Sequence, residues 1–279
     1  MDLATLCRRI SLPEEAIGPV LRRSETPVSE DILRALTVLD TAPDAYQACK
    51  ALCNPEERGL DLLSLMLRAA LMAYDNYQRQ GIGDGIFLAT MGCFSRFVGE
   101  HLASFGTAGF DRGWWTYRQL SMRLFRTGEL EYEFCPDEQT IHLHVPSDTR
   151  LLLPLCAASL EQFRRFAAEH CPDRAQWPVV IDSWLLSPAL DGLLPAESNI
   201  RRFKSCFDLT GWDQTGTEFL QWVYGRADIP YPQLPERTRL QRAVKARLLG
   251  GGTVGNARGV LRAFGPLRKV DRTKAAVRS

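Results

Sequence analysis

The chain has 279 residues, of which 45% are hydrophobic and 24% are charged, with 34 Lys and Arg against 33 Asp and Glu. This length exceeds the roughly 100–200 residues of a single domain, so two domains are expected, and the composition excludes a disordered chain. The net charge of +1 gives no electrostatic reason to expect nucleic acid or an anionic membrane as a partner.

The first half of the chain predicts a series of helices separated by glycine and proline. Apolar side chains recur at helical spacing, and capping residues precede the periodic segments. Helices are expected over residues 29–39, 59–79, 85–102 and 114–126. Residues 1–127 are therefore predicted to form an all-helical N-terminal domain.

The hydrophobic period changes to strict alternation after Gly128. Residues 129–134 and 141–145 alternate apolar with polar side chains, which is typical of half-buried strands. The short turn between them predicts an antiparallel hairpin. Because the apolar faces of both strands must coincide, Phe134 is expected opposite Ile141.

The rest of the chain predicts a mixed sheet with helices. A helix up to about His170 leads into the apolar run 178–186, so strand, helix and strand form a βαβ unit. Two capped helices follow, and residues 259–264 predict a closing strand. The fold class is α+β, with a mixed α/β C-terminal domain over 128–270 and a basic tail over 271–279.

Two acid–histidine pairs are the most informative feature of the hairpin. The expected register places Glu133 opposite His142 and Glu131 opposite His144, on the non-core face of the sheet. A carboxylate fixes the tautomer of an imidazole, which suits a general base near neutral pH. Two alternatives stay open: ordinary ion pairs on a solvated face, or a metal site that uses His142 and His144.

The segment after the second strand predicts an anion site. Backbone N–H groups near Ser147, Asp148 and Thr149 precede a helix, where a pyrophosphate would bind. The alternative is that Ser147 or Asp148 caps this helix. Arg242 and Lys245, on a later basic helix, are candidate phosphate partners.

Four segments in this order resemble a known family. They are HVPSD (144–148), DSWLL (182–186), LLPAESNIRRF (193–203) and LPERTRLQRAVKARLLGGG (234–252). They resemble the bacterial acyltransferase-domain family, which has an N-acyltransferase N-terminal domain and a GNAT-like C-terminal domain. The resemblance implies a GNAT-like core in which two central parallel strands splay apart and an acyl-CoA lies in the opening. The chain departs from the pattern at two places, because the glycine-rich pyrophosphate loop is missing and Asp182 stands where the family commonly has His.

The resemblance and the hairpin together predict acyl transfer from acyl-CoA or a carrier-protein thioester to an amine. His144 is the expected base, oriented by Glu131, and Asp182 lines the opposite wall of the cleft with Ser183 and Trp184. No metal, nucleic acid or membrane partner is expected. The sequence leaves open whether the protein forms a homodimer. It also leaves open an alternative function, a non-catalytic ligand-binding or protein-interaction module on the same scaffold. The eight cysteines show no CxxC spacing, which predicts reduced thiols in a cytoplasmic protein.

Overall fold

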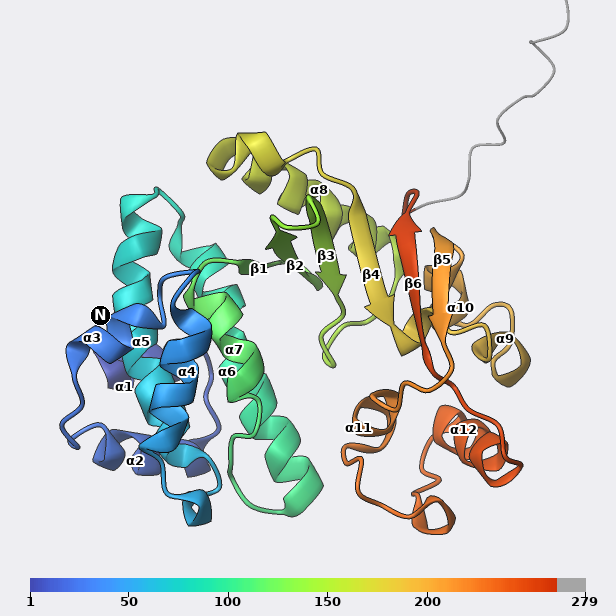
Figure 1. The fold of residues 1–279 in the computed structure, drawn as a ribbon, viewed down its shortest axis with the longest axis horizontal. Helices are drawn as coiled ribbons and strands as arrows, with labels where there is room; N and C mark the ends of the chain where they lie inside the picture. Colours follow the sequence, from blue (N-terminus) through green and yellow to red (C-terminus); the bar gives the residue numbers. More distant parts are fainter. Residues whose placement is uncertain (265–279) are drawn as a thin grey trace, which may run out of the picture.

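The computed structural model describes residues 1–264, and its N-terminal half is helical (Figure 1). The two longest helices of this half, α5 and α6, carry most of its buried apolar side chains. The helices are α1 (Leu3–Arg9), α2 (Glu14–Arg23), α3 (Glu30–Ala35), α4 (Ala42–Ala51), α5 (Leu60–Arg79), α6 (Asp84–Phe105) and α7 (Gly113–Leu120).

The second half is built on one six-stranded sheet with the strand order β1-β2-β3-β4-β6-β5 (Figure 1). Its β3 and β4 are parallel and all other neighbours are antiparallel, so the predicted mixed sheet and βαβ unit are confirmed. The strands are β1 (Leu124–Thr127), β2 (Leu130–Cys135), β3 (Thr140–His144), β4 (Val179–Ser183), β5 (Phe207–Asp213) and β6 (Asn256–Leu261).

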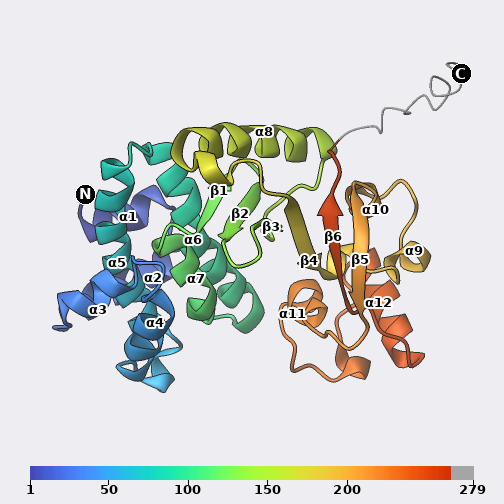
Figure 2. The same cartoon turned by 45° about the horizontal axis from the view of Figure 1, so that its top comes forward.

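Different helices pack on the two faces of strands β1 to β3. Helix α8 (Leu153–His170) packs on one face (Figure 2). There Phe163 stacks on Tyr132 with ring centroids 4.1 Å apart. On the opposite face, α6 reaches β1, where the Thr90 hydroxyl accepts a hydrogen bond from the Arg126 amide at 3.0 Å. The helical half therefore covers the face that carries the two glutamates of β2.

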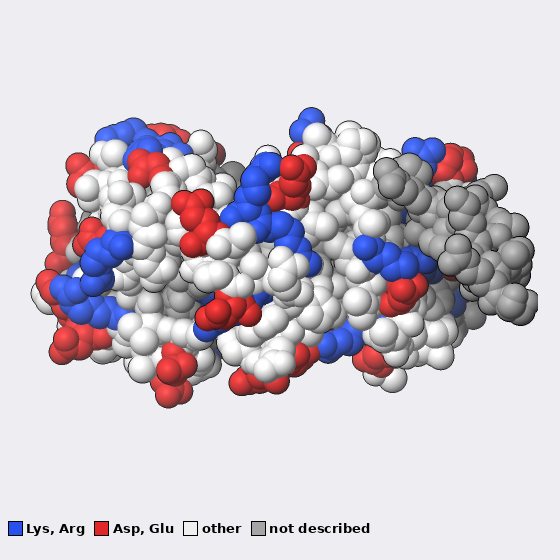
Figure 3. Space-filling model, turned by 90° about the horizontal axis from the view of Figure 1, so that it is seen from above, with Lys and Arg blue, Asp and Glu red and all other residues white. Residues whose placement is uncertain are grey.

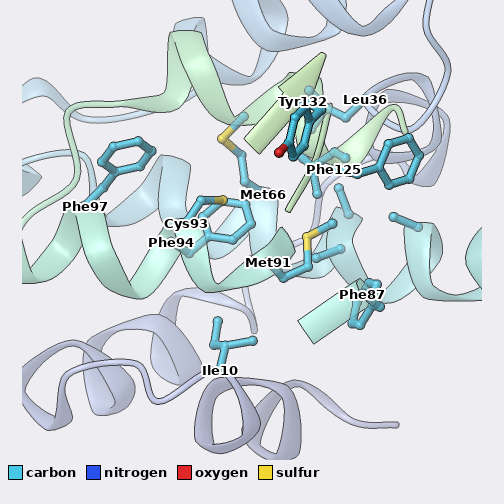
Figure 4. Packing of buried hydrophobic residues seen from close by; sticks show 14 of the residues in the cluster. Ile10, Leu36, Met66, Phe87, Met91, Cys93, Phe94, Phe97, Phe125 and Tyr132 are labelled. Atoms are coloured by element: carbon cyan, nitrogen blue, oxygen red, sulfur yellow. The ribbon is translucent and has the colours of Figure 1, made fainter. Parts of the chain in front are cut away.

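One hydrophobic core runs through both halves of the chain. Phe125 and Tyr132 of the sheet belong to the same cluster as Met91 and Phe94 of α6 (Figure 4). Burial of this continuous apolar surface is what fixes the helical half against the sheet. The boundary at residue 127 stays a prediction, since the two halves share their core.

A second, smaller core lies below the sheet (Figure 1). It includes Phe219 and Val244 and is built by α9 (Leu190–Leu193), α11 (Phe219–Tyr224) and α12 (Arg239–Leu249). Thr238 caps α12 and forms a capping box with Gln241. Helix α10 (Asn199–Lys204), capped by Ser198 as expected, packs beside α8.

The hairpin register is confirmed, with Phe134 opposite Ile141. The closing strand expected over 259–264 is present three residues earlier, as β6. Residues 265–279, which include the predicted basic tail, lie outside the described part of the chain.

Two element predictions are wrong, and one strand was missed. The helix expected up to Arg126 ends at Leu120, because Met122 adopts a left-handed backbone conformation (φ 55°) and the chain then pairs with β2 as strand β1. The strand expected over 178–186 stops at Ser183 and turns into a short 3-10 helix. Strand β5 was not expected at all, because its exposed side chains lack an apolar pattern.

Charged side chains of both signs are interspersed on the face shown in Figure 3, without a single-sign patch. Among the helices of residues 1–264, none combines the length and apolar character that a membrane span requires.

Candidate active site

His144 and Glu133 form a hydrogen-bonded pair at the end of β3. The His144 Nε2 atom lies 2.9 Å from Glu133 Oε2, and the imidazole packs edge-on against the Trp115 ring of α7 at 4.7 Å. Glu133 is not the residue opposite His144 in the register but its diagonal neighbour, which a long side chain reaches easily. Trp115 also stacks with the Arg118 guanidinium at 4.5 Å.

Two arginines hold the Glu133 carboxylate in its ionised form. Arg123 Nε lies 2.7 Å and Arg118 Nε 3.2 Å from Glu133 Oε1. Burial by itself raises the pKa of Glu133, but the hydrogen bond and charge of His144 and the charges of Arg118 and Arg123 outweigh it and lower the pKa to about 2. Because the carboxylate only accepts hydrogen bonds, His144 must donate from Nε2, which leaves Nδ1 as the basic nitrogen.

The predicted contact between Glu131 and His144 is wrong. Glu131 faces His144 in the backbone register, but its carboxylate binds Arg96 of α6 at 2.8 Å. Both side chains are almost fully buried, with exposed fractions of 2% for Glu131 and 8% for Arg96. A buried carboxylate requires a cationic partner, and α6 supplies it. The alternative of ion pairs on a solvated face is also wrong, because α6 and α7 bury both glutamates.

Strands β3 and β4 part next to His144. They pair only at Ile141 with Val179 and at His142 with Val180, after which β4 continues to pair with β6 alone. Asp182, on the stretch of β4 that pairs with β6 but no longer with β3, is exposed. The other two residues expected on this wall have local roles, since the Ser183 hydroxyl caps the following turn and Trp184 packs against the second core.

The loop between β3 and α8 holds its polar residues in fixed contacts. The Ser147 hydroxyl donates to Glu100, Asp148 pairs with Arg126 at 2.9 Å, and the Thr149 hydroxyl donates to the Glu129 carbonyl at 2.7 Å. None of the three caps α8, whose N-cap is Leu152 without a side-chain hydrogen bond. The capping alternative is therefore wrong. The first turn of this helix has no side-chain cap, but Pro154 has no N–H and the Leu155 amide bonds to the Leu152 carbonyl at 2.9 Å.

The two expected phosphate partners on α12 are engaged locally. Lys245 Nζ lies 2.8 Å from Glu236 Oε1 and donates to the Leu234 carbonyl at 2.9 Å. Arg242 donates to the Glu236 backbone carbonyl at 2.9 Å. Both cations therefore support the chain segment that precedes their own helix.

His142 has its own carboxylate and stands apart from His144. Its Nε2 lies 3.3 Å from Glu138, which also binds Arg258 of β6, and the two imidazole centroids are 6.5 Å apart. Within residues 1–264, no group of three or more His, Cys, Asp or Glu side chains is arranged as a metal site.

Sequence reasoning missed the residues that the helical half contributes, namely Trp115, Arg96, Arg118 and Arg123. A signal for them was present in the sequence. The two glutamates share one face of a strand, and they need cationic partners once another part of the chain buries that face. Arg96 stands within the apolar stripe of α6, between Phe94 and Val98. An arginine in such a stripe indicates a buried ion pair.

A mixed sheet whose two central parallel strands part is the arrangement that the GNAT-like resemblance implies, and sequence comparison agrees. Residues 96–261 match the model of the GNAT-like C-terminal domain, and residues 1–122 match the N-acyltransferase N-terminal domain. The chain therefore belongs to the GNAT-like acyltransferase family with an N-acyltransferase N-terminal domain. This confirms the resemblance of the four sequence segments.

Solved structures support the same fold over nearly the whole chain. An acyltransferase in complex with decanoyl-CoA and teicoplanin is 23% identical, with a TM-score of 0.69 over 94% of this chain and 99% of that chain. An acyltransferase in complex with CoA and 10C-teicoplanin is also 23% identical, with a TM-score of 0.65 over the same shares. No curated protein matches the chain in sequence.

Proposed function

We propose that this protein transfers an acyl group from acyl-CoA to an amine acceptor, with His144 as the general base. The observation that carries the proposal is the His144–Glu133 pair beside the point where β3 and β4 part. The similar acyltransferases that bind decanoyl-CoA or CoA support the choice of donor.

The geometry gives each residue of the pair a defined part. Glu133 stays ionised and accepts from Nε2, so Nδ1 of His144 takes a proton from the acceptor ammonium. The acceptor nitrogen then forms a C–N bond with the thioester carbonyl carbon. The C–S bond breaks, and CoA leaves as the thiol with the second ammonium proton. Trp115 fixes the orientation of the imidazole.

The loop after β3 is less repulsive to the anionic phosphates of acyl-CoA than its sequence indicates. Asp148 would repel a phosphate, but Arg126 lies 2.9 Å and Arg96 3.9 Å from its carboxylate. Arg126 therefore offsets the negative charge of Asp148. Pro154 in the first turn of α8 has no N–H, and the Thr149 and Arg150 amides already bond to Pro146 and Glu129. The proposed pyrophosphate site is therefore the loop backbone near Ser147 and Asp148. Asp182 is proposed to face the donor from β4.

Replacement of His144 by Gln tests the proposed base. We expect kcat to fall by ~10²–10⁴-fold, the usual contribution of a general base, with little change in thermal stability. The matched control is His142→Gln, since His142 lies on the same strand, is similarly buried and binds its own carboxylate. Equal activity in both variants would remove His144 from the mechanism.

Thermal stability with and without acyl-CoA tests the donor independently. A donor at about a hundred times its dissociation constant should stabilise the fold by roughly 2.7 kcal/mol. Acetyl-CoA, longer acyl-CoAs and free CoA are compared, and the dependence on chain length identifies the acyl class. The absence of a shift with every donor would favour a non-catalytic module or a carrier-protein donor.

A further inference from the structure

A cavity of about 200 Å³ lies between the two halves of the chain, next to the loop that begins after His144. The C-terminal end of α6, the segment before α7 and helix α11 enclose it, and Ser147 is part of its wall. Ser104 of α6 donates to the Gly225 carbonyl after α11 at 3.3 Å, so both sides are in direct contact. His144 is not among the residues that line it, and Ser147 is the residue that it shares with the proposed pyrophosphate loop.

One acidic group in the cavity wall lacks a cationic partner. Glu100 accepts a hydrogen bond from the Ser147 hydroxyl, and burial raises its pKa, although that hydrogen bond and the charges of Arg96 and Arg112 oppose the shift. Arg112 is occupied by Asp111 at 2.7 Å, and Arg96 by Glu131 at 2.8 Å. Within residues 1–264, neither arginine forms an ion pair with Glu100.

The rim of the same cavity carries exposed aromatic rings. Phe105 is 46% exposed and Trp222 is 43% exposed, although both rings are large and apolar. Arg226 lies over the Phe105 ring at 4.9 Å, and Arg112 lies 5.6 Å from the Trp222 ring centroid. Exposed aromatic side chains around a polar cavity are typical of a binding site for a ligand with an apolar body.

We propose that this cavity is the acceptor site, where Glu100 binds the acceptor ammonium while an aromatic or apolar body lies on Phe105 and Trp222. The inference rests on the proposed acyl transfer and names its substrate class. Pockets for drug-sized ligands span ~300–1,000 Å³. A cavity of about 200 Å³ therefore holds the amine head group, and the rest of a larger acceptor extends over the rim.

Binding of 2-phenylethylamine, compared with its uncharged analogue 2-phenylethanol, tests the site by calorimetry. The wild-type protein should bind the amine ~10-fold or more tightly than the alcohol, because a hydrogen bond to a charged group contributes that much. Glu100→Gln should abolish this preference, and Trp222→Ala should weaken the binding of both probes. Glu161→Gln, at an exposed carboxylate of α8, is the matched control and should change neither.

The outcomes separate this inference from the proposed function. Acyl-CoA affinity is measured in Trp222→Ala and should be unchanged; Glu100→Gln is not used for this comparison, because Glu100 accepts from Ser147 in the proposed pyrophosphate loop. Equal binding of amine and alcohol by the wild type, or a preference retained by Glu100→Gln, would overturn the acceptor site. Charge-selective amine binding by a protein that neither binds acyl-CoA nor forms the N-acyl product would support the site and refute the acyl transfer. If Glu100→Gln lowers stability, Trp222→Ala still tests the site. Trp222 is 43% exposed, so its replacement should leave the fold intact.

Discussion

Replacement of Glu133 by Gln removes a buried negative charge that faces Arg118, Arg123 and His144. The pKa of Glu133 falls from its usual 4.5 to about 2 in the folded protein, and only 5% of its side chain is exposed. At 1.36 kcal/mol per pKa unit, the ionised carboxylate stabilises the fold by about 3 kcal/mol at neutral pH.

The pH dependence has a definite sign. A carboxyl group with a lowered folded pKa stabilises the protein above its unfolded pKa, and the contribution is lost as the pH falls from about 4.5 towards 2. The difference in unfolding free energy between wild type and Glu133→Gln should therefore shrink from about 3 kcal/mol at pH 7 to about 1 kcal/mol at pH 3.

Urea denaturation at both pH values measures this difference. The control is Glu161→Gln, whose carboxylate also pairs with an arginine, Arg165, but on an exposed surface. Such a pair contributes about 0–1 kcal/mol, so this variant should change little at either pH. The reasoning is refuted if Glu133→Gln costs no more than the control at pH 7, or if its cost does not decrease at pH 3.

Three further substitutions probe buried contacts that hold the fold together. Arg96→Met leaves Glu131 buried without a cation and should cost ~3–5 kcal/mol in urea denaturation, whereas an unchanged midpoint would contradict the buried pair. Gly59→Ala should lower Tm sharply or prevent folding. Gly59 has a φ of 77°, and a Cβ atom at this position would lie 1.9 Å from the Phe110 carbonyl oxygen. A variant with the Tm of the wild type would disprove this close approach. Ser159→Ala removes a buried hydroxyl that bonds to β1 and β2, and calorimetry should show a loss of about 1–3 kcal/mol, with no loss indicating that water replaces it.

The sequence determined the local elements and the hairpin register. Alternation of apolar and polar residues is a property of neighbouring positions, so the pairing of Phe134 with Ile141 followed from the pattern alone. Helix caps such as Ser198 and Thr238 were equally readable, because a capping side chain bonds to the backbone a few residues away. The four segments that resemble the acyltransferase family also lie within the sequence itself.

Only the tertiary structure decided which carboxylate forms the hydrogen bond with His144. Register placed Glu131 opposite the imidazole, but packing of α6 against this face brought Arg96 onto Glu131 and left the diagonal Glu133 for His144. The effect of Asp148 on the loop was likewise decided by the fold, because Arg126 pairs with its carboxylate and offsets its negative charge. Such choices depend on charges from distant segments that meet only when the apolar core closes, because a buried carboxylate takes the nearest cation that the fold brings to it.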